Sequence, residues 1–199
     1  MKSLYVFERD SKFIYEFEIQ NKTLSKRTAI TSANFPHNFQ TVILPSGKLF
    51  FIGGGEFNSL NESMFKCYEV LTSNFEFVNK DRMKFPRHGH SACALNEKFL
   101  MVTGSRKENE SAHQKCEQYN VDLDMWFEVA PLNEGRHYHA SCSFKDRWVY
   151  VFCGISNATK KYINSIERYD QQTKKVWEVI TFNGEQITGR QGLGVAQVN

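Results

Sequence analysis

Residues 136–155 read RHYHASCSFKDRWVYVFCGI, and similar phrases occur at residues 86–105 (PRHGHSACALNEKFLMVTGS) and 35–55 (FPHNFQTVILPSGKLFFIGGG). Each phrase opens on a polar turn, passes through small or apolar residues, and closes with an apolar run that stops at glycine. Self-similarity at a fixed period of about fifty residues is the signature of a repeat architecture. The sequence therefore predicts one structural unit that is written three times.

The glycines that end the apolar runs set the period. Gly54, Gly104 and Gly154 stand 50 residues apart. A tyrosine follows each glycine, and a large aromatic residue follows each tyrosine by seven or eight positions: Tyr68 with Phe75, Tyr119 with Trp126, and Tyr169 with Trp177. Short apolar runs separated by Gly, Asn, Asp and Lys turns are typical of strands, and no window of a dozen residues holds a helical apolar period. Each unit is expected to contain four short strands.

The repeated pattern resembles the kelch repeat. It contains R-x-x-H with small residues after it, an apolar run into Gly-Gly, then Tyr-Asp and Trp, and its best copy runs from Arg136 to Val179. The first copy departs from the pattern, because it has Pro36-His37 where the others have arginine. The double glycine is complete only at residues 53–55, and becomes Gly-Ser and Cys-Gly in the later copies. The resemblance implies an all-β fold, a kelch-type β-propeller or open propeller fragment built of four-stranded antiparallel blades.

The whole chain is predicted to be a single kelch-repeat domain, residues 1–199. Its expected parts are a partial blade (1–33), three blades (34–84, 85–134 and 135–187), and the first strand of a further blade or a closing strand (188–199). The last strand could close a four-bladed ring, or the chain could be part of a larger propeller, which suits the five to seven blades usual in the family. A third alternative is a nonfunctional remnant of a longer gene. An open arc exposes sheet edges, so self-association through them is expected.

Composition narrows the possible partners and compartment. The chain has 199 residues and a net charge of +3, spread too evenly for a nucleic-acid surface. The N-terminus does not resemble a signal peptide, and no segment approaches the roughly 18 apolar residues of a membrane helix. Five cysteines occur without a C-x-x-C pair, which favours a reducing compartment. These features predict a cytoplasmic protein that binds neither nucleic acid nor membrane.

Two His-x-His phrases, at His88 and His90 and at His137 and His139, are candidate metal ligands. Residues i and i+2 of a strand share a face, so imidazoles of adjacent blades could gather near the axis. The alternative is that His90 and His139 belong to the repeat pattern and hold loops by hydrogen bonds. We favour this alternative, because zinc requires a better-formed set of three or four ligands. Neither a metal nor a cofactor is expected.

Polar turns that recur once per blade are the candidate contact surface for a partner. Function concentrates on loops carried by rigid scaffolds, and Arg and Tyr are typical anchors of interfaces. Carboxylates are scarce in these turns, so an acidic peptide segment is the expected ligand. The alternative is that the arginines only brace blades through carbonyls or carboxylates. The candidate residues are Arg87, His88, Arg136, His137, Tyr138 and Arg190.

The function predicted from the resemblance is a non-catalytic protein–protein interaction scaffold that binds a protein partner through propeller loops. Substrate adaptors and cytoskeletal linkers are known roles of kelch relatives. The sequence holds none of the G-x-S-x-G, P-loop or H-E-x-x-H motifs. The alternative is an enzyme built on the propeller, a sugar isomerase or oxidase, with its site at the channel mouth. An enzyme would need ionisable side chains in mutual reach at that mouth.

Overall fold

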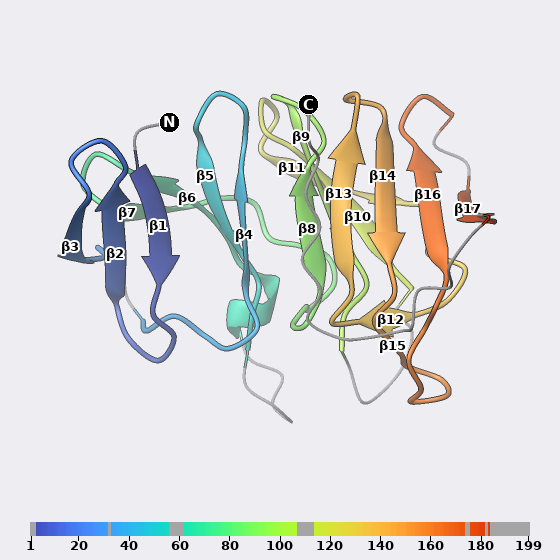
Figure 1. The fold of residues 1–199 in the computed structure, drawn as a ribbon. Coiled ribbons are helices and arrows are strands. Elements are labelled where there is room, and N and C mark those ends of the chain that lie inside the picture. Colours follow the sequence, from blue (N-terminus) through green and yellow to red (C-terminus); the bar gives the residue numbers. More distant parts are fainter. Residues whose placement is uncertain are drawn as a thin grey trace.

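The computed structural model shows antiparallel sheets standing side by side in an arc (Figure 1). It describes residues 3–31, 33–55, 62–106, 114–173, 176–181 and 183. Three of the sheets have four strands that follow one another in sequence from the inner to the outer edge. The predicted all-β fold of kelch-type propeller blades is confirmed.

The three four-stranded sheets are called the first, second and third blade. The first blade contains β4 (Gln40–Ile43), β5 (Leu49–Ile52), β6 (Cys67–Leu71) and β7 (Glu76–Asn79). The second contains β8 (Ser91–Ala94), β9 (Phe99–Thr103), β10 (Cys116–Asn120) and β11 (Met125–Val129). The third contains β13 (Ala140–Phe144), β14 (Trp148–Phe152), β16 (Ile166–Asp170) and β17 (Trp177–Ile180).

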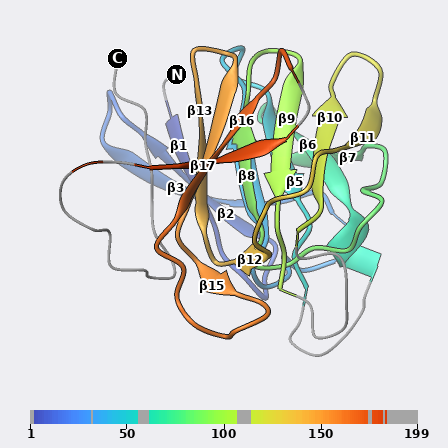
Figure 2. The same ribbon diagram turned by 90° about the vertical axis from the view of Figure 1, so that its right-hand side faces the viewer.

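The remaining elements are smaller. An N-terminal sheet contains β1 (Ser3–Phe7), β2 (Phe13–Glu18) and β3 (Thr23–Thr28). A two-stranded sheet pairs β12 (Arg136–His137) with β15 (Ile155–Ser156), and Figure 2 shows it at one end of the third blade. A single 3₁₀ turn, η1, covers Glu62–Phe65. Residues 188–199, predicted as a further first strand, lie outside the described residues.

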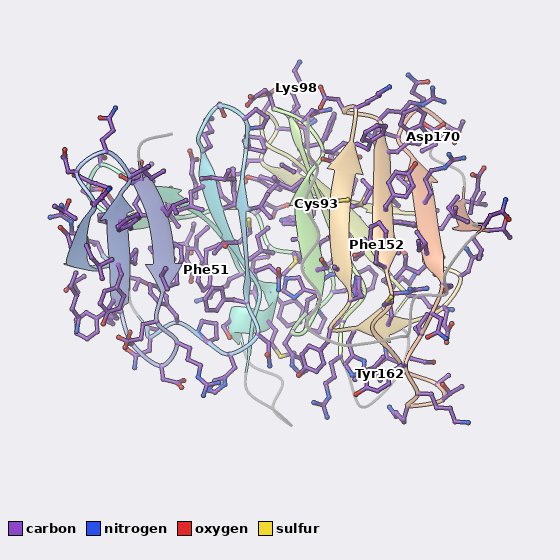
Figure 3. The ribbon with its side chains drawn as sticks, viewed as in Figure 1. Phe51, Cys93, Lys98, Phe152, Tyr162 and Asp170 are labelled. Atoms are coloured by element: carbon purple, nitrogen blue, oxygen red, sulfur yellow. The ribbon has the colours of Figure 1, made fainter. Side chains whose placement is uncertain are left out.

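The innermost strands of the three blades lie next to one another, with β8 between β4 and β13 (Figure 1). Their residues are mostly small, so the backbones can approach closely. The hydroxyl oxygens of Ser91 and Ser141 are 2.7 Å apart and join β8 to β13. Cys93, labelled in Figure 3, lies on β8, and none of the five cysteines forms a disulfide bond in the described part of the chain.

Apolar side chains fill the space between neighbouring sheets. Phe50 and Trp126 belong to the core between the first and second blades, and Tyr169 belongs to the core between the second and third. Phe51 (Figure 3) packs in the core that joins the N-terminal sheet to the first blade. Burying one such side chain stabilises the fold by roughly 1.5–3 kcal/mol. Each blade therefore depends on its neighbours, because one sheet alone cannot bury both of its faces.

Strand pairing corrects the expected equivalence of the tyrosines. Tyr119 lies opposite Leu100 on one side and Trp126 on the other. The residue with the same pairing in the first blade is Val70, which lies opposite Leu49 and Phe77. Tyr68 therefore does not correspond to Tyr119.

The error has a conformational cause. Phe75 occupies the hairpin turn with φ of 56°, as Asp124 does with φ of 51° in the second blade, so Phe75 is not the counterpart of Trp126. The glycines spaced 50 residues apart are likewise not all equivalent in the blades. The left-handed position has φ of 58° at Gly53, 58° at Gly104 and 57° at Cys153, so the repeat preserves a backbone angle rather than a residue type.

Among the described residues, no helix has the length and apolar character required to cross a membrane.

Candidate functional site at the inner turns

Two arginines of the predicted contact surface lie inside the blades. Arg87 and Arg136 are both 0% exposed. Arg87 is paired with Glu117 of β10 at 2.9 Å, and Arg136 is paired with Glu167 of β16 at 2.5 Å. A buried ion pair needs further hydrogen bonds to offset the loss of hydration of both charges.

Backbone carbonyls supply these bonds to each guanidinium group. Arg87 Nη1 donates to the carbonyls of Gly104 at 2.7 Å and Lys115 at 2.8 Å. Arg136 Nη1 donates to the carbonyls of Cys153 at 3.0 Å and Ser165 at 3.2 Å. In the second and third blades the arginine thus ties the end of the second strand to the start of the third.

The two glutamates complete the brace from the other side. Glu117 accepts a bond from the backbone N–H of Lys84 at 2.7 Å, and Glu167 accepts one from that of Asn133 at 2.7 Å. Each Arg–Glu pair therefore fixes the loop that enters its blade as well as two strands of that blade.

Glu117 and Glu167 were not predicted as functional residues from the sequence, although a signal was present. Each glutamate precedes the tyrosine of its blade by two residues, and each occurs in a copy that has the arginine. In the first blade Tyr68 takes the position of these glutamates, since it lies opposite Phe51 as Glu117 lies opposite Val102. Pro36 takes the position of the arginine. The arginine and the glutamate therefore occur together in the second and third blades, and both are absent from the first.

The first blade replaces this polar brace with aromatic packing. Phe39 stands where the other blades have His90 and His139, since Gly54 approaches Phe39 as Gly154 approaches His139. The rings of Phe39 and Phe51 stack with their centroids 4.2 Å apart. Stacked rings need no charge partner, which explains why this blade tolerates the loss of both ionic residues.

His90 and His139 are enclosed beneath the glycine turns. Their exposed fractions are 1% and 5%. His139 Nε2 lies 2.8 Å from Thr103 Oγ1, and a Cβ atom at Gly53 would come within 2.9 Å of the ring of His90. Burial and the nearby Arg87 charge lower the pKa of His90 to about 3, and burial lowers the pKa of His139 well below its usual range. Both imidazoles are therefore neutral near pH 7.

The turn residues at the mouth of the inner strands form a hydrogen-bonded row. Asn38, Gly89 and Tyr138 have φ of 54°, 60° and 51°, one in each blade. The N–H of Tyr138 donates to the carbonyl of Gly89 at 2.8 Å, and the N–H of Gly89 donates to that of Asn38 at 3.3 Å. A Cβ at Gly89 would lie 2.8 Å from the ring of Tyr138, so glycine is needed there for close approach, because Asn38 and Tyr138 adopt nearly the same backbone angle with a side chain.

This row borders a cleft of about 330 Å³ between the three inner strands. Tyr138 is half-buried at its edge, and its hydroxyl accepts a bond from Arg106 at 3.4 Å. In Figure 3, Lys98 and Asp170 lie at one end of the blades. Tyr162 lies at the opposite end, where β12, β15 and the cleft also lie. Among the described residues that line the cleft, none is Asp, Glu, Lys or Arg. The lining is Asn38, Gln40, Gly89, His90, Ser91, Ala92, Tyr138, His139, Ala140 and Ser141.

Comparison with known proteins agrees with this architecture. A family model described as the attractin/LZTR1 β-propeller matches residues 49–197, about three quarters of the chain. The chain belongs to this kelch-type propeller family.

Individual relatives match at 27–31% identity. Kelch-like protein 24 of Homo sapiens is 27% identical over 150 residues, which cover 75% of this chain and 22% of the relative. F-box protein AFR of Arabidopsis thaliana is 31% identical over 105 residues, 52% of this chain and 27% of the relative. Kelch-like protein 41a of Danio rerio is 28% identical over 133 residues, 66% of this chain and 21% of the relative. This kelch-type chain thus spans about a fifth to a quarter of the length of these relatives.

In this kelch-type propeller the predicted contact residues do not share one surface. Arg87, Arg136, His88 and His137 are buried, and only Tyr138 borders the cleft. The expectation that an acidic peptide pairs with Arg87 and Arg136 meets a physical obstacle, because each charge is already paired with glutamate and removed from solvent. The contacts of Arg87 and Arg136 agree with the alternative, in which the arginines brace the blades through carbonyls or carboxylates. Arg190 lies outside the described residues.

The His-x-His phrases likewise do not assemble a metal site in the described part of the chain. No group of three or more His, Cys, Asp or Glu side chains comes together there. The alternative was that both histidines hold loops by hydrogen bonds. His139 contacts Thr103 in this way, whereas neither ring nitrogen of His90 has a hydrogen-bond partner among the described residues.

Proposed function

We propose that this chain is a non-catalytic protein-binding propeller segment that contacts its partner through the mouth of the inner strands. The observation that carries the proposal is the cleft at the row of Asn38, Gly89 and Tyr138, where turns of three blades converge on uncharged polar groups. Loops held by a rigid scaffold are where binding residues concentrate. Kelch-like and F-box proteins among the relatives agree with such a role.

The lining of the cleft suits a neutral peptide segment better than an acidic one. Ser91, Ser141, Gln40 and Asn38 offer hydroxyl and amide groups, and Tyr138 offers an aromatic edge. A partner loop with Ser, Asn or backbone amides could satisfy these groups directly. Within the cleft, the imidazoles of His90 and His139 are neutral and enclosed, which supports binding rather than acid–base chemistry.

Replacing Tyr138 by asparagine tests the proposal with little risk to the fold. Asn38 already occupies the matching position with nearly the same backbone angle, so Tyr138→Asn removes the ring and keeps a residue that tolerates positive φ. Proteins captured from cell extract by the wild type and by the variant would be compared by quantitative mass spectrometry. Phe144→Ala, at the far end of β13, is the control for loss of a partly exposed aromatic.

We expect Tyr138→Asn to reduce capture of a specific partner about tenfold or more, as loss of an aromatic anchor does, while Phe144→Ala leaves it unchanged. The wild type and both variants must show the same circular dichroism spectrum and the same melting temperature. Equal capture by the wild type and Tyr138→Asn would show that the partner uses another surface.

A further inference from the structure

A second cleft lies on the outer side of the blades, between the second and third, far along the sheet from the mouth. Its volume is about 410 Å³, within the range of roughly 300–1,000 Å³ usual for small-molecule sites. Phe99, Phe127, Val129 and Ala130 supply apolar lining from the second blade, and Tyr169 closes it from the third. The cleft therefore occupies the gap where the two sheets splay apart.

Two buried polar groups in this cleft have no hydrogen-bond partner among the described residues. The hydroxyl of Tyr169 and the side-chain amide nitrogen of Gln118 are both unpaired. Tyr169 is 0% exposed and Gln118 is 3% exposed. A buried polar group that lacks a partner costs about 1–3 kcal/mol, so such groups are uncommon unless something binds to them.

At the neighbouring interface, between the first and second blades, polar side chains occupy the region that corresponds to this cleft. There the hydroxyl of Tyr119 donates to Asp124 at 2.6 Å, and Asp124 also accepts from the N–H of Asp81 at 2.8 Å. Lys80 and Glu69 form an ion pair at 2.9 Å on the facing sheet. We call Glu69, Lys80, Asp81 and Asp124 the polar plug.

At the second interface, apolar or neutral residues replace Glu69, Lys80 and Asp81 of the polar plug, and the counterpart of Asp124 lies outside the described residues. Trp126 donates its ring N–H to the carbonyl of Asp81, and Trp177 donates in the same way to Ala130, so Ala130 replaces Asp81. The adjoining residue, Val129, replaces Lys80. Tyr68 and Glu117 occupy matching positions in the first and second blades, and the residue after each is Glu69 and Gln118. Gln118 therefore replaces Glu69. The cleft lies where these three residues are replaced.

We propose that this outer cleft binds a small neutral organic ligand, an apolar group about the size of a benzene ring that carries one oxygen acceptor. The hydroxyl of Tyr169 and the amide of Gln118 would both donate to that oxygen, which could belong to a carbonyl or an ether. The phenyl rings of Phe99 and Phe127 would cover the apolar part. The site is separate from the mouth and does not depend on the function proposed for it.

The electrostatics of the cleft favour a neutral ligand over an anion. Burial raises the pKa of Tyr169 to about 12, so its hydroxyl keeps its proton at neutral pH and remains a donor. Glu128, at the edge, is paired with Lys115, and this ion pair brings no net charge to the cleft. A charged ligand would lose its hydration there without gaining an opposite charge from the described lining residues.

Acetophenone and isopropylbenzene are suitable probes, because they have nearly the same shape and only acetophenone has an acceptor oxygen. Binding would be followed by NMR titration of the whole chain, at the side-chain amide of Gln118 and the methyl group of Ala130. We expect saturable shifts with acetophenone and an affinity about 25-fold weaker for isopropylbenzene, which lacks both hydrogen bonds, since one neutral hydrogen bond contributes about fivefold.

Three variants assign the effect to the cleft. Tyr169→Phe should weaken acetophenone binding about fivefold and leave isopropylbenzene unchanged. Tyr119→Phe, the matched change at a hydroxyl already bonded to Asp124, should leave both affinities unchanged. The double variant Gln118→Glu, Val129→Lys would install the ion pair of the polar plug and should abolish binding of both probes.

Several results would overturn the proposal. One is the absence of a saturable shift up to the solubility limit of acetophenone. It would mean that the Tyr169 hydroxyl and the Gln118 amide bind only water. Another is equal affinity for the two probes, which would make the cleft an apolar gap without a polar anchor. A third is an acetophenone affinity that survives the double variant, which would place the ligand elsewhere. If Tyr169→Phe does not fold, the double variant and the two-probe comparison still decide.

Discussion

At the scale of single residues, each Arg–Glu pair places two full charges in the interior of the fold. Arg136 and Glu167 are 0% and 1% exposed at the side chain, and each is bonded to backbone as well as to the other. Removing one member leaves the other as an uncompensated charge in the interior. The same logic holds for Arg87 and Glu117.

We expect Arg136→Ala to lower the free energy of unfolding by about 3–5 kcal/mol, the usual cost of breaking a buried pair. Urea denaturation measures the change. Arg147→Ala is the control, because the Arg147–Asp170 pair is exposed and pairs of that kind contribute little to stability. A loss below about 1 kcal/mol for Arg136→Ala would contradict the bracing role.

His90 makes stability depend on pH. Its pKa is about 3 in the folded chain and 6.5 in the reference state, so below pH 6.5 the unfolded chain binds a proton that the folded chain does not. The free energy of unfolding should therefore fall as the pH drops from 6.5, and the contribution of His90 to stability is lost progressively toward pH 3. One such group contributes a slope of up to about 1.4 kcal/mol per pH unit.

The measurement compares urea unfolding of the wild type and His90→Gln between pH 7 and pH 5, above the range in which most carboxylates titrate. The variant should show the smaller slope. Identical slopes would mean that His90 is protonated as readily in the folded chain as in the unfolded one.

At the scale of the structural element, the inner turns depend on space as well as on backbone angle. Gly104 has φ of 58°, and a Cβ there would come within 2.3 Å of the carbonyl oxygen of Arg136. Gly47 also has positive φ, 90°, but nothing lies within 4 Å of its Cβ position. Comparing the two glycines separates the cost of the angle from the cost of the contact.

Gly104→Ala should therefore destabilise the chain by about 2 kcal/mol more than Gly47→Ala, the size of an overpacked contact. Thermal or urea unfolding of both variants gives the difference. Equal losses would show that the backbone angle alone demands glycine at residue 104.

Much of each blade could be predicted from the sequence, because apolar runs and turn residues repeat visibly. The strand order within the blades required no more than that repetition. The equivalence of Tyr68 with Tyr119 was wrong, since spacing along the chain does not reveal where a hairpin turns, and pairing across strands decides the alignment. The repeat pattern of Arg136 was visible, but its burial was not, because that depends on Glu167, which is distant in sequence.

At the scale of the whole molecule, the N-terminal sheet has an edge that no described strand covers. Within the described residues, β1 pairs only with β2. Leu4 and Val6 on β1 are 53% and 60% exposed. An edge of this kind is a template for pairing with another chain.

We expect the isolated chain to self-associate with rising concentration, as measured by sedimentation velocity. Leu4→Lys combined with Val6→Lys should shift the chain toward monomer, because charged side chains on an edge strand oppose pairing. Leu123→Lys, an equally exposed leucine in the β10–β11 turn, is the control and should have no effect. A wild type that remains monomeric at all concentrations would show that the edge of β1 is covered in solution.

The hydrogen bonds that cross from one repeat to the next also have a consequence for synthesis on the ribosome. The carbonyl of Arg87 accepts the N–H of Gly54, and the carbonyl of Arg136 accepts the N–H of Ser105. The turn at the end of β9 is therefore completed by residues that are translated later, after the rest of its own blade. We expect nascent chains of the second blade to stay sensitive to protease until Arg136 has left the exit tunnel, and to become resistant once β13 follows. Arrested chains of increasing length, digested while still attached to the ribosome, would show a step in protection at that point, whereas protection that rises as soon as β11 emerges would mean that a blade matures without its successor.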